Sequence, residues 1–185
     1  MNRRIFLQVP ILASISRLVA RSPIQFSKNK GFVVRAGRDR HDSELDIMGG
    51  VFDCKVSAKD TDGAFCMFDT IRHEKGGPAL HLHYSQDELF YVIKGRFRIK
   101  VGDDVFDLKP GDFAFAPRMI PHAFAMTSDG DGQMLVSFQP AGSMENFFKR
   151  MSKLFGKNIP ANRQELMKQL WAEHGMKVMG PPLPV

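Results

Sequence analysis

Hydrophobic and polar residues alternate along most of the chain between residues 50 and 139, and this period of two predicts β-strands. Residues 96–101 (Arg-Phe-Arg-Ile-Lys-Val) alternate strictly, which indicates one face on a core and one face in water. Turn-forming residues such as Lys94-Gly95 and Gly102-Asp103 separate these segments. Many short strands with regular turns predict an antiparallel barrel or jelly roll. We expect strands at residues 32–34, 51–56, 64–71, 79–83, 88–94, 96–101, 105–108, 113–116, 122–126 and 134–139.

The period of the pattern changes after residue 142, where apolar residues recur three and four positions apart. Ser143 can cap a helix whose apolar stripe holds Met144, Phe147, Phe148, Met151, Leu154 and Phe155. A second helix is expected to begin near Asn162, with Glu165 as a capping-box partner and Gly175 as the stop. Both apolar stripes are expected to pack against the barrel or against a second subunit.

Three histidines and one glutamate stand at the predicted strands with a spacing that favours metal binding. His81 and His83 are two residues apart, so strand geometry aims both rings at the same face. Glu88 opens the next strand, and His122 opens a later one. If these strands pair as antiparallel neighbours, the four donor groups meet at one point.

Three imidazoles and one carboxylate suit a divalent transition metal, such as Fe, Mn, Ni, Co, Cu or Zn. The single carboxylate cancels one of the two positive charges. A five- or six-coordinate ion would then keep one or two positions for water, substrate or dioxygen, as catalytic centres do. A lone histidine pair is more often a pair of ordinary core residues, but Glu88 and His122 at matching positions favour a metal site.

The first three of these residues and a following glycine resemble the first cupin motif, His81-x-His83-x4-Glu88-x6-Gly95. The last one closes a segment that resembles the second cupin motif, Gly111-x5-Pro117-x4-His122. Two positions depart from the family pattern, with Met119 in place of a usual glycine and Met126 in place of a frequent asparagine.

This resemblance implies an all-β fold, the cupin double-stranded β-helix (a jelly-roll barrel), followed by C-terminal α-helices. The expected organisation is a signal segment at 1–27, a barrel with the metal site at 28–141 and a helical extension at 142–185. Because many cupins are dimers, the resemblance also implies a homodimer.

The layout is similar to that of single-domain quercetinase-like cupins, which share the segment Pro140-Ala141-Gly142…Glu145-Asn146-Phe147-Phe148. By that resemblance, the protein is a metal-dependent dioxygenase that cleaves a flavonol or another enolic or phenolic small molecule with dioxygen. His81, His83 and His122 would hold the ion, and Glu88 would bind it and act as general base. An apolar substrate pocket is expected from side chains with the strand parity of these ligands, namely Phe90, Phe124 and Met126.

Two other classes of function stay open at this point. In the first, the metal anchors a small ligand or carbohydrate in a binding or sensing cupin without catalysis. In the second, the protein is a sugar-nucleotide or acid isomerase, which the scarcity of Lys, Arg and Asn on the inward face of the motif strands disfavours.

The other histidines and the two cysteines do not share this spacing. His41 and His73 have no ligand-spaced partner and are predicted on the surface or in loops. His174 lies in the last turn of the second helix, where the helix dipole explains it. Cys54 and Cys66 flank a turn, and they can form a disulfide in an oxidising compartment or remain buried thiols.

The net charge of +6 is unevenly distributed. Residues 41–140 hold ten basic and sixteen acidic side chains, so the predicted barrel is acidic and the positive charge lies towards the two ends. This distribution argues against a nucleic-acid partner. The sequence also has no run of about 18 apolar residues, so we expect no transmembrane helix and no membrane partner.

Residues 2–8 (Asn-Arg-Arg-Ile-Phe-Leu-Gln) resemble a twin-arginine export motif, and an apolar run broken by Arg17 follows at 9–20. This pattern predicts a periplasmic or exported protein. The alternative is a basic amphipathic arm on a cytoplasmic protein. On the export hypothesis, cleavage falls between about residues 20 and 28. N-terminal sequencing of the protein purified from its native cell tests this, and an intact Met1 terminus would refute it.

Overall fold

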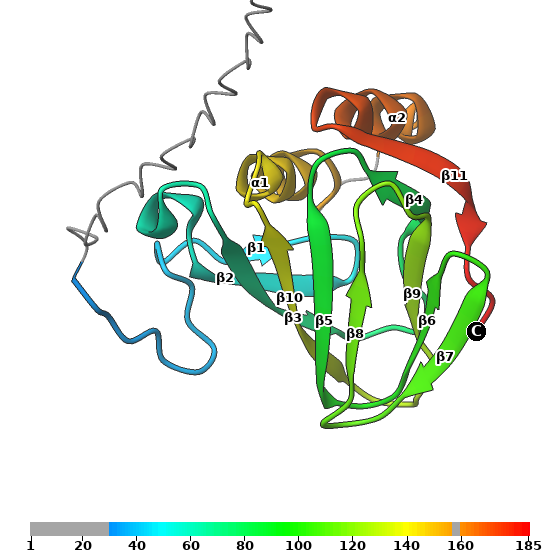
Figure 1. Cartoon of the computed structure of the whole chain (residues 1–185), viewed down its shortest axis with the longest axis horizontal. Helices are drawn as coiled ribbons and strands as arrows, with labels where there is room; N and C mark the ends of the chain where they lie inside the picture. The colour runs from blue at the N-terminus through cyan, green and yellow to red at the C-terminus, as the bar shows by residue number, and fades with distance from the viewer. Residues whose placement is uncertain (1–29, 157–159) are drawn as a thin grey trace, which may run out of the picture. The chain divides into compact units, whose positions relative to one another are not determined.

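The structure is a computed structural model that describes residues 30–156 and 160–185 (Figure 1). The predicted signal segment lies outside the described residues. The strands and helices all belong to one compact unit, Gly31–Val185. Within the described residues, no helix is long and apolar enough to cross a membrane.

Two antiparallel sheets form the body of this unit. The first sheet has the strand order β1-β2-β3-β10-β5-β8, and the second has the order β11-β4-β9-β6-β7 (Figure 1). The first sheet consists of β1 (Leu45–Asp46), β2 (Gly50–Val56), β3 (Cys66–Arg72), β10 (Gly132–Gln139), β5 (Asp87–Lys94) and β8 (Phe113–Ala116). The second consists of β11 (Met176–Pro182), β4 (Ala79–His83), β9 (His122–Met126), β6 (Phe97–Val101) and β7 (Asp104–Leu108).

Two α-helices follow the barrel strands, α1 (Met144–Phe155) and α2 (Arg163–Glu173). In Figure 1 both helices lie at the same end of the barrel, with α2 beside β11 and α1 above β1. These elements confirm the predicted all-β jelly roll followed by C-terminal helices.

The strict alternation at residues 96–101 appears in the structure as the two faces of β6. Phe97 and Ile99 are buried in the core. On the opposite face, the Arg98 guanidinium donates to Asp107 on the neighbouring β7 at 2.9 Å. The alternation predicted the strand correctly because its apolar residues face the core and its charged residues face water.

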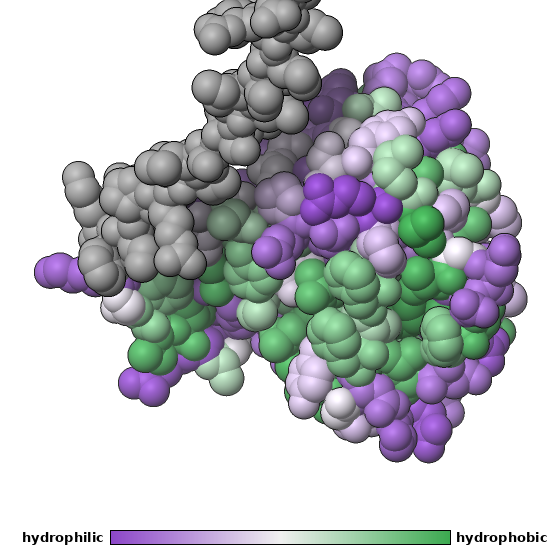
Figure 2. Space-filling model, viewed as in Figure 1, coloured by the Kyte–Doolittle hydropathy of each residue, from purple (hydrophilic) through white to green (hydrophobic). Residues whose placement is uncertain are grey.

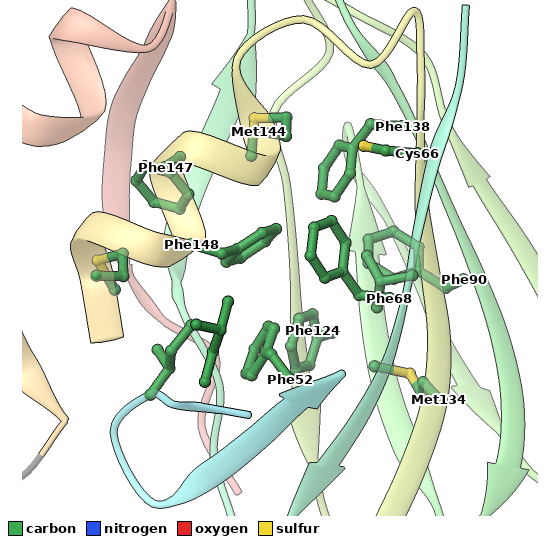
Figure 3. Packing of buried hydrophobic residues seen from close by; sticks show 14 of the residues in the cluster. Phe52, Cys66, Phe68, Phe90, Phe124, Met134, Phe138, Met144, Phe147 and Phe148 are labelled. Carbon is green, nitrogen blue, oxygen red and sulfur yellow. The ribbon is translucent and has the colours of Figure 1, made fainter. Parts of the chain in front are cut away.

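The core between the sheets is filled by phenylalanine rings, and helix α1 contributes part of it (Figure 3). The ring of Phe68 on β3 is fully buried, and its centroid lies 4.8 Å from that of Phe148 on α1. Phe148 also lies 5.0 Å from Phe52 on β2. The apolar stripe of α1 therefore packs on the barrel, one of the two arrangements expected for it.

One predicted strand does not form. Residues 32–34 lie in an irregular segment, and the side chain of Val33 is 74% exposed. Phe32 instead packs under the Arg40 guanidinium, 4.0 Å from the ring centroid. The prediction was wrong because β-branched residues favour a strand only where a neighbouring strand pairs with them.

The last strand, β11, is absent from the predicted elements. It contains Gly180 and two prolines, which are unfavourable in strands, but it pairs with β4 at the edge of the second sheet. It brings Met176 opposite His83 and Val178 opposite His81. The chain therefore returns to the barrel after α2, directly beside two of the predicted metal ligands.

The helix starts differ from the predicted capping. Ser143 and Asn162 are the N-cap residues, but neither side chain forms a cap hydrogen bond. The structure has a capping box at Ser57 instead, ahead of the short 3₁₀ helix Ala58–Thr61.

Cys54 and Cys66 are both buried free thiols, and burial is the main cause that raises the pKa of each to about 12.

One outward face of the barrel is apolar. The paired strands β5 and β8 expose Tyr91, Ile93, Phe113 and Phe115, and apolar side chains gather over these strands in Figure 2. Exposed apolar patches of this kind mark interaction surfaces. The homodimer implied by the family resemblance stays a prediction, and this face is the natural place to look for it.

Replacing Phe68 with alanine should lower the free energy of unfolding by about 3–5 kcal/mol, because the change leaves a cavity among packed rings. The control is Phe106→Ala on β7, where the side chain is 50% exposed and a change within about 0.5 kcal/mol is expected. Equilibrium unfolding in urea measures both. Equal losses in the two variants would contradict the assignment of Phe68 to the core.

Candidate metal centre

The four predicted ligands come from three strands in two sheets. His81 and His83 lie on β4, and His122 begins β9, where it pairs with His81. Glu88 lies on β5 in the other sheet and reaches across the interior. All four side chains are buried, and one ligand atom from each falls within a group whose members are no more than 4.8 Å apart.

The distances between these atoms fit a shared ion. The Oε2 atom of Glu88 lies 2.8 Å from Nε2 of His122, 3.1 Å from Nε2 of His83 and 3.8 Å from Nε2 of His81. Two metal–ligand bonds of about 2.1 Å at a right angle place their donor atoms about 3.0 Å apart. These residues therefore fit a transition-metal ion, with the imidazole Nε2 atoms and the carboxylate as donors.

Backbone carbonyls orient two of the imidazoles. His81 donates from Nδ1 to the carbonyl oxygen of Ala79, and His122 donates from Nδ1 to that of Ile120, each at 2.8 Å. A proton on Nδ1 makes Nε2 the atom that is available to bind an ion, as in metal sites generally. Nδ1 of His83 is buried and has no hydrogen-bond partner within the described residues.

The electrostatics of the site favour an ionised Glu88 and a neutral His81, which are the forms that bind a metal ion. Burial raises the pKa of Glu88, but the three imidazoles around it, His122 first, outweigh this effect and hold the pKa well below its usual range. Burial lowers the pKa of His81, against the opposing effect of Glu88. Burial also disfavours the charged form of His122, but the hydrogen bond that it donates to Glu88 raises its pKa overall. A bound cation would take the place of the proton that His122 shares with Glu88.

An ion pair holds the loop that delivers His122 next to the strand that carries Glu88. Asp87 accepts a hydrogen bond from the backbone N–H of Arg118 at 2.8 Å and another from its guanidinium at 2.7 Å. These hydrogen bonds lower the pKa of Asp87 to about 2. Met119 follows with a positive φ of 66°, and its N–H donates to the carbonyl of His83 at 2.8 Å. That left-handed conformation explains why the cupin pattern favours glycine there.

The centre lies in the wall of a cavity of about 900 Å³ that is lined mainly by apolar side chains. Helices α1 and α2 supply part of this wall with Met144, Phe147, Phe148, Met167 and Trp171. The Trp171 ring lies 4.6 Å from the ring of His81, centroid to centroid, and nearly perpendicular to it. Sequence reasoning placed the α1 residues and Trp171 on packing stripes, did not single out Met167, and missed that all of them also form the site.

The three predicted pocket residues separate in the structure. Phe124 lines the cavity, whereas Phe90 and Met126 are fully buried beneath it in the core. Phe90 packs against His122, with 6.3 Å between the two ring centroids, but does not line the cavity. Met126 shares the parity of His122 but lies four residues along β9, beside Phe97 and away from the ion site.

The remaining histidines have other partners. His73 is half-exposed and pairs with Asp131 at 2.9 Å, as expected for a surface residue. His174 is buried, and its Nδ1 donates to the carbonyl of Leu170 at 2.8 Å. Its Nε2 lies 3.3 Å from the side-chain amide of Asn146 on α1. His174 therefore links α2 to α1, whereas the sequence predicted an interaction with the dipole of its own helix.

His41 lies near Cys54 and Glu145, a grouping that the sequence did not predict. Nε2 of His41 is 3.6 Å from Oε1 of Glu145. Both carboxylate oxygens already accept hydrogen bonds, from Lys149 at 2.6 Å and from the Ser57 hydroxyl at 2.6 Å. We therefore interpret Glu145 as the residue that ties α1 to the start of the 3₁₀ helix.

Comparison with known proteins agrees with the fold and the site. Residues 70–138 match the cupin domain family, and this range contains all four ligands. The match is consistent with the jelly-roll architecture of this part of the barrel. The chain is also 35% identical over 43 residues to the uncharacterized protein MJ1618 of Methanocaldococcus jannaschii. That alignment spans 23% of this chain and 34%, about a third, of the relative.

Similar solved structures include KdgF from Halomonas sp., which is 20% identical, with a TM-score of 0.47. The superposition covers 53% of this chain and 87% of KdgF. An RmlC-like cupin from Shewanella frigidimarina is 22% identical, with a TM-score of 0.45 over 54% of this chain and 84% of that one.

Replacing His81 and His83 together with alanine should abolish stoichiometric metal binding, because only two of the four donors remain. Elemental analysis of the purified protein, loaded with Fe, Mn, Ni, Co, Cu or Zn in turn, measures the ion content per chain. His73→Ala is the matched control and should keep about one ion per chain. A folded double variant that retains the metal would show that the ion binds elsewhere.

Proposed function

We propose that the protein is a metal-dependent dioxygenase that acts on a flavonol-like or other enolic or phenolic small molecule. The observation that supports this most is that three of the four predicted ligands, His81, His83 and Glu88, line a large apolar cavity. Closed structural metal sites use all their positions for protein ligands, whereas this one adjoins space for a substrate.

The roles of the residues follow from their positions. His81, His83 and His122 would hold the ion. When bound, the ion acts as a Lewis acid that lowers the pKa of an enolic hydroxyl of the substrate. Glu88 lines the cavity and is ionised, so it can accept the proton of that hydroxyl as a general base. Phe147, Phe148 and Trp171 would cover the substrate and exclude water from it.

The binding or sensing alternative is less well supported by the cavity. Carbohydrates need several hydrogen-bonding side chains around their hydroxyl groups. Here the walls are mainly phenylalanine, methionine and other apolar residues. An apolar ring system with one or two polar atoms fits this lining better than a sugar does.

The test is oxygen uptake by protein loaded with Fe, Mn, Ni, Co or Cu, with quercetin and a panel of simpler enolic phenols as substrates. Uptake that depends on both metal and substrate is expected. Glu88→Gln should lower kcat by about 10²–10⁴-fold, and its metal content has to be measured alongside because Glu88 is also a ligand. His73→Ala should keep full activity. Metal-loaded protein that consumes no oxygen with any of these substrates would refute the proposal.

A further inference from the structure

One arginine lines the cavity far along the barrel strands from the metal centre. Arg72 is the last residue of β3, and its side chain shares the inward parity of Phe68 and Thr70, both buried. It lines the same cavity as His81 and Glu88. An arginine at an inward position of a phenylalanine-filled barrel needs a partner for its charge.

Within the described residues, the one carboxylate that acts on the charge of Arg72 is that of Glu74, which raises the pKa of Arg72 against the larger effect of burial but forms no ion pair with it. The Nε atom of Arg72 is buried without a hydrogen bond, and no carboxylate among these residues forms an ion pair with its guanidinium. An unpaired buried donor costs stability, and the cost is larger when the group is charged. Such a group is therefore expected to meet an anion from outside the chain.

The strand register gives the separation of Arg72 from the metal centre. Glu88 lies opposite Phe138 on β10, and Phe138 lies opposite Cys66 on β3. Arg72 is six residues further along β3, which corresponds to about 20 Å between the backbones. The cavity thus has the metal ligands at one end and a guanidinium at the other.

Apart from Glu88, the charged residues that line the cavity are basic. Glu88 is the one acidic residue in the lining formed by the described chain, and three imidazoles already surround it. The other charged residues of the lining are basic, with exposed Arg163, Lys168 and Lys177 contributed by α2 and β11. The potential of the cavity therefore favours the entry of an anion.

We propose that Arg72 is an anchor for an acidic group, and that the ligand is an elongated apolar organic anion, such as an aryl or aliphatic carboxylate. Its acidic group pairs with Arg72, its apolar body lies along Phe52, Phe124 and Phe148, and its other end reaches the metal ligands. The identity of that reacting end rests on the proposed dioxygenase function, whereas the anchor does not.

The test measures binding to the metal-free protein in the presence of a chelator, so it depends neither on the ion nor on turnover. Trp171 is the one tryptophan of the chain and lines the cavity, so its fluorescence reports occupancy. The probes are dodecanoate and dodecan-1-ol, which differ in the charged head group and share the apolar chain. Dodecanoate should bind about tenfold or more tightly than the alcohol.

Arg72→Gln should remove this preference, weakening dodecanoate about tenfold and leaving dodecan-1-ol within about twofold. Arg72→Lys should retain part of it. Arg98→Gln is the matched control, since Arg98 pairs with Asp107 on the outer surface and should leave both affinities unchanged. Equal affinities of the two probes for the native protein would overturn the proposal. So would an unchanged dodecanoate affinity in folded Arg72→Gln.

The two proposals fail separately. A native protein that prefers dodecanoate but consumes no oxygen keeps the anchor and loses the dioxygenase. A protein that consumes oxygen with neutral phenols and shows no head-group preference keeps the dioxygenase and loses the anchor.

Discussion

The contact between the Glu88 carboxylate on one sheet and three imidazoles on the other is the interaction on which the functional site depends. It joins the two sheets inside the barrel, where an uncompensated charge would be very costly. The jelly roll makes it possible because β4 and β9 pair within one sheet while β5 faces them from the other. The buried Glu88 carboxylate, whose charge the imidazoles compensate within the barrel, is also the group that a divalent ion would bind.

The C-terminal segment turns this buried polar cluster into a site with a substrate-sized space. Helix α1 closes the core with Phe148, and α2 places Trp171 against His81. Strand β11 then returns along β4 and covers the edge next to the ligands. A barrel without this segment would expose the cavity and the ligand strand to water, so the extension acts as part of the site and not only as a cover.

The ligands and most strands could be predicted from the sequence because both follow local rules. Alternation assigns residues such as Phe97 and Arg98 to opposite faces, and His81 and His83 share a face for the same reason. Other features depend on contacts between distant segments. Residues 32–34 lack a pairing strand, β11 forms against the propensity of its prolines, and the closeness of Trp171 to His81 arises only when α2 folds back. Parity likewise could not show that Phe124 faces the cavity while Phe90 and Met126 lie beneath it, because all three point inward.

X-ray absorption spectroscopy at the edge of the bound metal tests the central claim most directly, because it reports the ligand atoms themselves. The account predicts a first shell with three imidazole nitrogens, recognisable by scattering from the outer ring atoms, and with carboxylate oxygen at about 2.0–2.2 Å. A first shell that contains sulfur, or fewer than three imidazoles, would contradict it and place the ion outside the set formed by His81, His83, Glu88 and His122.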